Sequence, residues 1–143
     1  MKTRTLALAC VAAAVLGGCS TTDGYVDTVN EIQADVLEAS SALGSDPNAS
    51  KSEILALLEA AESEASSAVA ELDEIDVPAD AKAGHAELVA SFEELSELLG
   101  SVRDQVEDSS GGEAFAELRS KGAEIDRQID AAIDQINADL GLE

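Results

Sequence analysis

Residues 81–106 read AKAGHAELVASFEELSELLGSVRDQV, and apolar side chains, with one histidine among them, recur there in alternating steps of four and three residues. These positions are Ala81, His85, Leu88, Phe92, Leu95, Leu99, Val102 and Val106. A mean step of three and a half residues is the pattern of helices that pack side by side with a left-handed supercoil. The stretch therefore predicts a long amphipathic helix with one buried face.

Three further segments, residues 25–43, 54–75 and 115–136, show the same spacing. Their apolar seam positions are Tyr25, Val29, Ile32, Val36, Ala39 and Leu43; Ile54, Leu58, Ala61, Ala65, Ala68, Leu72 and Ile75; and Phe115, Leu118, Gly122, Ile125, Ile129, Ala132 and Ile136. No segment shows the sustained alternation of apolar and polar residues that is typical of strands.

Short stretches rich in Gly, Pro, Ser and Asp separate the four segments, at residues 44–48, 76–78 and 109–113. Connections this short force consecutive helices to run antiparallel. The sequence therefore predicts an all-α fold, an antiparallel up-down-up-down four-helix bundle with left-handed heptad packing.

The expected helix ends carry recognisable capping residues. Ser50-x-x-Glu53 and Ser110-x-x-Glu113 have the spacing of capping boxes, and Asp46-Pro47 is an alternative start for the second helix. Pro78 suits the first position of the third helix. Gly122 lies on the fourth seam, where it either permits a close helix approach or is simply tolerated at a cost in helix propensity.

The first eighteen residues differ in composition from the rest of the chain. Lys2 and Arg4 precede the uncharged run TLALACVAAAVL at residues 5–16, which is the order of a secretory signal. The apolar run is shorter than the roughly 20 residues that span a bilayer, so a permanent transmembrane helix is not expected here.

This segment ends in Leu16-Gly17-Gly18-Cys19, which resembles the lipobox of bacterial lipoproteins. The resemblance implies cleavage before Cys19, a diacylglycerol thioether on its sulfur, and an N-acyl chain such as palmitate in addition. We therefore expect a signal peptide at 1–18, a lipidated N-terminus and short tether at 19–24, and the bundle at 25–143. The alternative is an ordinary secretory signal that happens to be followed by a cysteine. Cys10 leaves with the signal, so the mature chain has no disulfide.

The chain is strongly acidic, with 30 Asp plus Glu against 8 Lys plus Arg and a formal net charge of −22. Such a charge repels nucleic acid and anionic lipid surfaces, so neither is expected as a charge-driven partner. Glu117 with Lys121 and Arg103 with Glu107 have the spacing of ion pairs one helical turn apart. The acidic faces are interpreted as solvated surface, with diffuse cation binding or recognition of a basic partner as the alternatives.

His85 is the single histidine and lies on the third seam. One histidine with no Glu-x-x-His motif does not make a bundle metal site, and no catalytic residues can be assembled around it. We expect no metal, no catalytic residue, and no cofactor apart from the lipid on Cys19. A buried His85 needs a polar partner, and the predicted threading brings Tyr25 and Asn137 to the same end of the bundle, with Asp76 and Asp139 as further candidates.

The stretch from Val77 to Leu88, VPADAKAGHAEL, resembles small helical lipoproteins of high-GC Gram-positive bacteria. The resemblance implies a location and a fold but no reaction. The expected function is a non-enzymatic binding or scaffolding module at the cell envelope, lipid-anchored on the extracytoplasmic face of the cell membrane. Its partner is expected to be an envelope protein, with a basic one favoured by the charge. The alternative is an envelope sensor or a ligand- or cation-binding regulator that uses the acidic surface and the His85 end.

Overall fold

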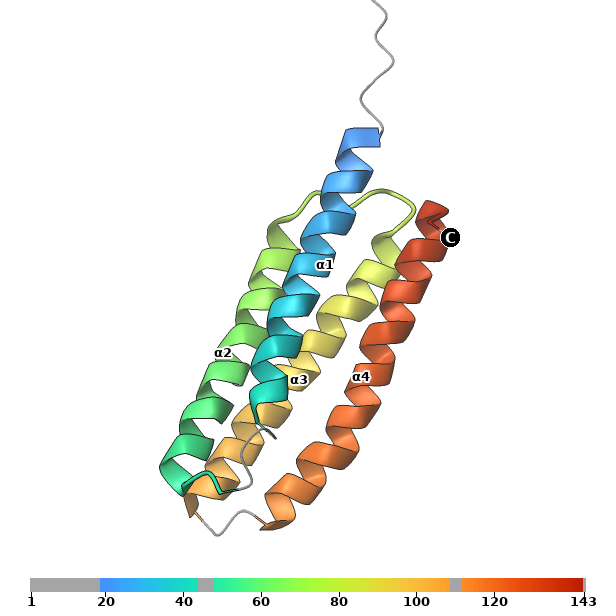
Figure 1. Cartoon of the computed structure of the whole chain (residues 1–143). Coiled ribbons are helices and arrows are strands. Elements are labelled where there is room, and N and C mark those ends of the chain that lie inside the picture. The colour runs from blue at the N-terminus through green and yellow to red at the C-terminus, as the bar shows by residue number, and fades with distance from the viewer. Residues whose placement is uncertain (1–18, 44–47, 109–111, 143) are drawn as a thin grey trace, which may run out of the picture.

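The computed structural model describes residues 19–43, 48–108 and 112–142, and Figure 1 shows them as four long helices. These are α1 (Cys19–Ala42), α2 (Lys51–Glu74), α3 (Lys82–Asp108) and α4 (Gly112–Leu140). Consecutive helices run antiparallel, and α1 packs on α2, α2 on α3, and α3 on α4. The prediction of an all-α, up-down-up-down four-helix bundle is confirmed.

The first helix begins earlier than the sequence suggested. Residues 19–24 are the first turns of α1 rather than an extended tether. At 1.5 Å of rise per residue these six positions span about 9 Å, roughly half their extended length. Cys19 is therefore joined directly to the helix that carries Tyr25.

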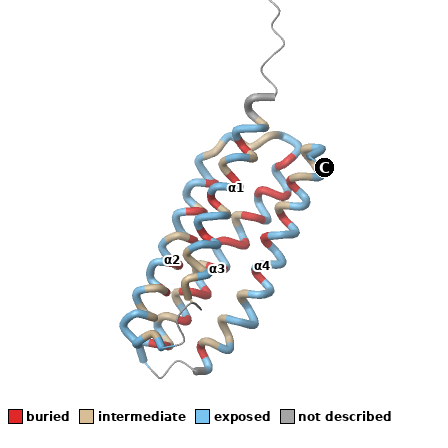
Figure 2. Tube along the Cα trace, in the orientation of Figure 1, coloured by how far each residue is buried: buried red, intermediate tan, exposed pale blue. Residues whose placement is uncertain are grey.

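The seam residues form the core, as Figure 2 shows by the red faces that the helices turn inward. All eight seam positions of the stretch 81–106 are buried. The largest fully buried side chains are Phe92, Leu58, Leu72, Leu88, Leu99, Ile125 and Val102. Every buried apolar residue of the described chain lies between Tyr25 and Ile136. Burial of this apolar surface is the main force that holds the four helices together.

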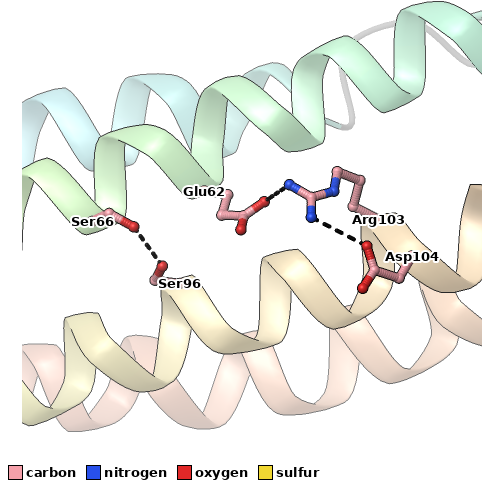
Figure 3. Close-up of polar contacts among 5 residues, drawn as sticks. All are labelled: Glu62, Ser66, Ser96, Arg103 and Asp104. Carbon is pink, nitrogen blue, oxygen red and sulfur yellow. Dashed lines mark hydrogen bonds and ion pairs between the residues drawn. The ribbon is translucent and has the colours of Figure 1, made fainter.

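Polar contacts join α2 and α3 along their solvent edge (Figure 3). The hydroxyl oxygens of Ser66 and Ser96 lie 2.7 Å apart. Further along, the guanidinium of Arg103 pairs with the carboxylate of Glu62 on α2 and, at 3.2 Å, with Asp104 on its own helix. These pairs are partly exposed, so each stabilises the fold only modestly.

The expected pair between Arg103 and Glu107 is wrong. Arg103 reaches across to Glu62 instead, and the room for that carboxylate comes from Gly100, where a Cβ would lie 2.9 Å from Oε1 of Glu62. The backbone carbonyl of Glu107 accepts a hydrogen bond of 2.8 Å from Lys51 Nζ. Sequence spacing identifies partners on the same helix but not a better placed acid on the next one.

Glycine permits a close helix approach at Gly84, not at Gly122. A Cβ on Gly84 would lie 2.9 Å from Cγ1 of Ile136 and 3.1 Å from the carbonyl oxygen of Ala132, so α3 and α4 touch there. A Cβ on Gly122 would meet nothing within 4 Å. The interpretation that Gly122 permits a close helix approach is therefore wrong, and the glycine is tolerated at a cost in helix propensity.

Helix ends follow local hydrogen-bonding chemistry. The capping box at α2 is confirmed, because the Ser50 side chain accepts from the Glu53 amide while the Glu53 carboxylate accepts from the Ser50 amide. Ser110 and the Asp46-Pro47 pair lie outside the described residues. Pro78 does not occupy the first helical position; its carbonyl closes a turn onto the Ala81 amide, and α3 starts at Lys82.

Candidate functional site

The expected contact between Tyr25 and His85 is present at the end of the bundle where α1 and α3 begin. Tyr25 Oη lies 3.1 Å from His85 Nδ1, and the two rings are tilted by 50° with centroids 5.8 Å apart. Both residues are buried, at 4% and 9% exposure. In the described part of the chain Asn137 makes no hydrogen bond to the ring, so the polar pair is Tyr25 with His85.

Burial governs the protonation of this pair. Burial lowers the pKa of His85, against a smaller opposing influence from the Leu72 backbone carbonyl and the charge of Asp73. Burial also raises the pKa of Tyr25 to about 12. At neutral pH the imidazole is therefore uncharged and the phenol protonated, so the phenol can donate to an unprotonated Nδ1. The arrangement satisfies two buried polar groups in a packed layer.

The lipobox residues Leu16, Gly17 and Gly18 lie outside the described residues, as does the side chain of Cys19. Within the ranges that the structure describes, no helix is long and apolar enough to cross a membrane. Nor do those ranges contain three or more His, Cys, Asp or Glu side chains grouped so that they could hold a metal ion.

A feature that sequence reasoning missed is a hollow of about 500 Å³ where the C-terminal half of α1 meets α3 and the N-terminal half of α4. Its walls are mainly apolar. The lining residues are Ser40, Leu43, Leu95, Leu99, Phe115, Leu118, Arg119, Gly122, Ala123 and Asp126.

A second hollow of about 190 Å³ adjoins the first and shares Ser40, Leu95 and Asp126 with it. The other residues that line it are Gln33, Val36, Leu37, Phe92, Ile129 and Asp130. Leu37 stands at the rim with 62% of its surface exposed. We refer to the two hollows together as the α1–α4 groove.

The groove exists because the seam between α1 and α4 is incompletely closed. Four seam residues of the heptad pattern are only half-buried here: Ala39 on α1, Leu43 directly after it, and Phe115 and Leu118 on α4. Gly122, between Leu118 and Ile125, contributes no side chain to fill the space. The periodicity correctly assigns these residues to the apolar faces of their helices. Whether a groove opens between them depends on how closely α1 and α4 approach, and these two helices are not consecutive in the chain.

Charge opposes the approach of α1 to α4. Helix α1 has five acidic residues and no basic one, and α4 is acidic as well. Like charges on α1 and α4 oppose closure of the seam.

The groove also has a few polar residues, among them a serine and an aspartate that border both hollows, a second aspartate in the smaller hollow, and an arginine at the end of the wider hollow. The Ser40 Oγ, in the wall shared by both hollows, is fully buried and has no hydrogen-bond partner. Asp126 also borders both hollows, and Asp130 follows one turn later on α4. At the far end Arg119 is exposed, and its Nε donates to the Phe115 carbonyl at 3.4 Å.

The predicted ion pair of Glu117 with Lys121 is confirmed, with 2.7 Å between Nζ and Oε1. Glu117 Oε2 also accepts from Gln105 Nε2 on α3 at 3.2 Å. These hydrogen bonds lower the pKa of Glu117, with the Lys121 contact as the larger cause. The N-terminal part of α4 is thus linked to α3.

Comparison with protein families, with curated proteins and with solved structures finds no match for this chain. The candidate site is therefore defined by its own geometry: an apolar groove with a carboxylate edge, at the opposite end of the bundle from the Tyr25–His85 pair.

Proposed function

We propose that this protein is a non-enzymatic binding module, anchored through lipid on Cys19 to the extracytoplasmic face of the cell membrane. The observation that carries the proposal is the α1–α4 groove. Seam residues that a closed bundle would bury, such as Leu43 and Phe115, remain half-exposed there and offer apolar surface to a partner. The charge of the chain favours a partner that is basic.

The geometry supports this function in a further way. Ser40, at the centre of the groove, is 21 residues along α1 from Cys19, which corresponds to about 31 Å of helix. An acyl group on Cys19 would hold that end of α1 at the membrane and leave the groove facing away from it. A module of this kind presents its binding face to the space outside the membrane.

The test is photo-crosslinking in the cells that make the protein. A photoreactive amino acid in place of Leu37 samples the groove, and the same amino acid in place of Ala70, on the exposed face of α2, is the matched control. We expect adducts from position 37 that are absent at position 70. Equal labelling at both positions, or none at either, would contradict a binding role for the groove.

Anchoring is tested separately. A diacylglycerol thioether supplies two acyl chains, which is enough for stable membrane residence. We expect Cys19→Ala to leave the chain unprocessed or to release it from the membrane fraction, as measured by fractionation and by mass. A variant that is still cleaved and still membrane-bound would contradict the lipoprotein interpretation.

The alternative function, a sensor or regulator at the His85 end, finds less support. His85 is buried and hydrogen-bonded to Tyr25, which is the environment of a packing residue. A ligand-binding regulator that uses the groove remains compatible with the same geometry, and the crosslinked adduct distinguishes the two: a protein adduct supports a scaffold, and a small-molecule adduct supports a regulator.

A further inference from the structure

We infer that the α1–α4 groove binds an amphiphilic amine, with an apolar body in the wider hollow and a protonated amino group at Asp126. This inference rests on the proposed binding role of the groove, in its ligand-binding and not its scaffolding form, and names a ligand class for it. Three properties of the groove lead to it: its size, its apolar lining and its charge.

The wider hollow has the size and lining of a small-ligand site. Its volume of about 500 Å³ falls within the roughly 300–1,000 Å³ of such sites. It is lined with hydrocarbon by Leu43, directly after α1, by Leu95 and Leu99 from α3, and by Phe115 and Leu118 from α4. A ligand gains affinity here by burying an apolar body, since these walls offer few hydrogen-bonding groups.

The α4 edge of the groove is negatively charged, because Asp126 borders both hollows. A protonated amino group can donate to this carboxylate, whereas a carboxylate headgroup would meet the negative charge of Asp126. The Ser40 Oγ in the shared wall is closed to solvent, so it is not among the groups that contact the ligand.

The other charges near the groove also favour a positively charged ligand. Asp130 lies one turn from Asp126, and the whole chain carries a formal charge of −22. Among the described residues that line the groove, Arg119 is the one basic residue, and it lies seven residues from Asp126, about 10 Å along the helix. An amine headgroup at Asp126 is therefore close to two carboxylates and two helical turns from Arg119.

The experiment compares three ligands that share one chain length. Isothermal titration calorimetry is performed on the full chain carrying Cys19→Ser, with n-decylamine, n-decanol and n-decanoate, each below the concentration at which it aggregates. We expect decylamine to bind about two- to fivefold more tightly than decanol, a ratio in the range of one solvent-exposed charge pair. Decanoate should bind most weakly.

Two pairs of variants locate the binding. Asp126→Asn should bring the affinity for decylamine close to that for decanol, whereas Asp134→Asn, an exposed residue of α4 outside the groove, should leave the ratio unchanged. Gly122→Leu places a side chain in the empty space of the groove and should abolish binding of all three ligands. Gly24→Leu, at another helical glycine with no close neighbours, should not.

The inference is overturned if decanoate binds as tightly as decylamine, if Gly122→Leu binds decylamine like the parent chain, or if none of the three ligands binds. These outcomes are separate from those of the crosslinking test. A chain that crosslinks to a protein through position 37 but does not bind decylamine keeps the proposed function and loses the amine.

Discussion

Two helical glycines show how one residue type has opposite consequences in different surroundings. Gly84 sits where α3 contacts α4, and a Cβ would press on Ile136 and on the Ala132 carbonyl. Gly122 faces the groove, where a Cβ would meet nothing. Glycine in a helix interior lowers stability relative to alanine, so it is useful at the first position and only costly at the second.

We therefore expect alanine substitutions of opposite effect. Gly84→Ala should lower the free energy of unfolding by about 1–3 kcal/mol, because the added methyl forces the two helices apart. Gly122→Ala should raise it by about 0.5–1 kcal/mol through helix propensity alone. Chemical denaturation followed by circular dichroism measures both, and effects of the same sign would show that the α3–α4 contact is differently packed.

Tyr25 gives a second prediction at this scale, because it is the chain's single tyrosine. Burial raises its pKa from 10.0 to about 12 in the folded state. A group that is harder to ionise when folded makes the fold lose stability as pH rises above its unfolded value, here from about pH 10 upward. Absorbance at the tyrosinate band should titrate near 12 in the folded protein and near 10 in denaturant.

A variant of His85 tests whether burial, and not the hydrogen bond to His85, raises the pKa of Tyr25. The variant His85→Leu removes the partner of the Tyr25 phenol but keeps the position apolar. Since desolvation is the cause of the Tyr25 shift, the tyrosine pKa should stay well above 10 in this variant. A folded-state value near 10 in the parent chain would mean that Tyr25 is open to solvent.

At the scale of elements, the start of α2 depends on a single motif. Ser50 and Glu53 satisfy each other's backbone amides in the capping box. Ser50→Ala should lower the free energy of unfolding by about 1 kcal/mol. The control Ser67→Ala, at an exposed position in the same helix, should change it by a few tenths and in the stabilising direction. Equal effects in thermal melts would show that the cap contributes nothing.

The helices and their order could be predicted from the sequence, because heptad spacing and short connections depend on local chemistry. For His85 the sequence left four candidate partners at one end of the bundle, and the structure shows that Tyr25 is the one that contacts the ring. The seam of α3 is buried throughout since α3 has a neighbour on each side, α2 and α4. The groove could not be predicted, because periodicity shows which residues face inward but not whether α1 and α4 meet. The one feature of the sequence that pointed to the groove was Gly122, which places no side chain at a seam position whose neighbours are mostly large and apolar.

Pro78 illustrates the same limit at a helix end. Its fixed backbone angle suits a first helical position, and equally suits the turn that it actually forms with Ala81 before α3 begins. The choice between the two depends on where Ala81 and His85 must lie to be buried, which is a matter of tertiary packing. The backbone preference of Pro78 therefore predicts the start of α3 to within a few residues, but not the exact first residue of the helix.

At the scale of the whole molecule, charge is the dominant property. The chain carries a formal charge of −22. Among the described residues a few acidic side chains form ion pairs, such as Glu117 with Lys121, and most do not. Self-repulsion of this kind destabilises a compact state and is screened by salt over a Debye length of about 8 Å at physiological ionic strength.

The melting temperature should accordingly rise as monovalent salt increases to about 0.5 M. Sodium and potassium chloride should act alike, because screening does not depend on the identity of the ion. A melting temperature that is unchanged or lower in salt would contradict the picture of unrelieved repulsion. A difference between the two salts would indicate a specific ion site in place of general screening.

Helix α1 is at once the element that begins at Cys19 and one wall of the groove. An α-helix resists bending over 24 residues, and this one is braced mainly by α2. A displacement of α1 as a rigid body, imposed at its first residue, would therefore also move Ser40 near its other end. Since Ser40 lines the groove, a shift of α1 relative to α4 would change the width of the opening.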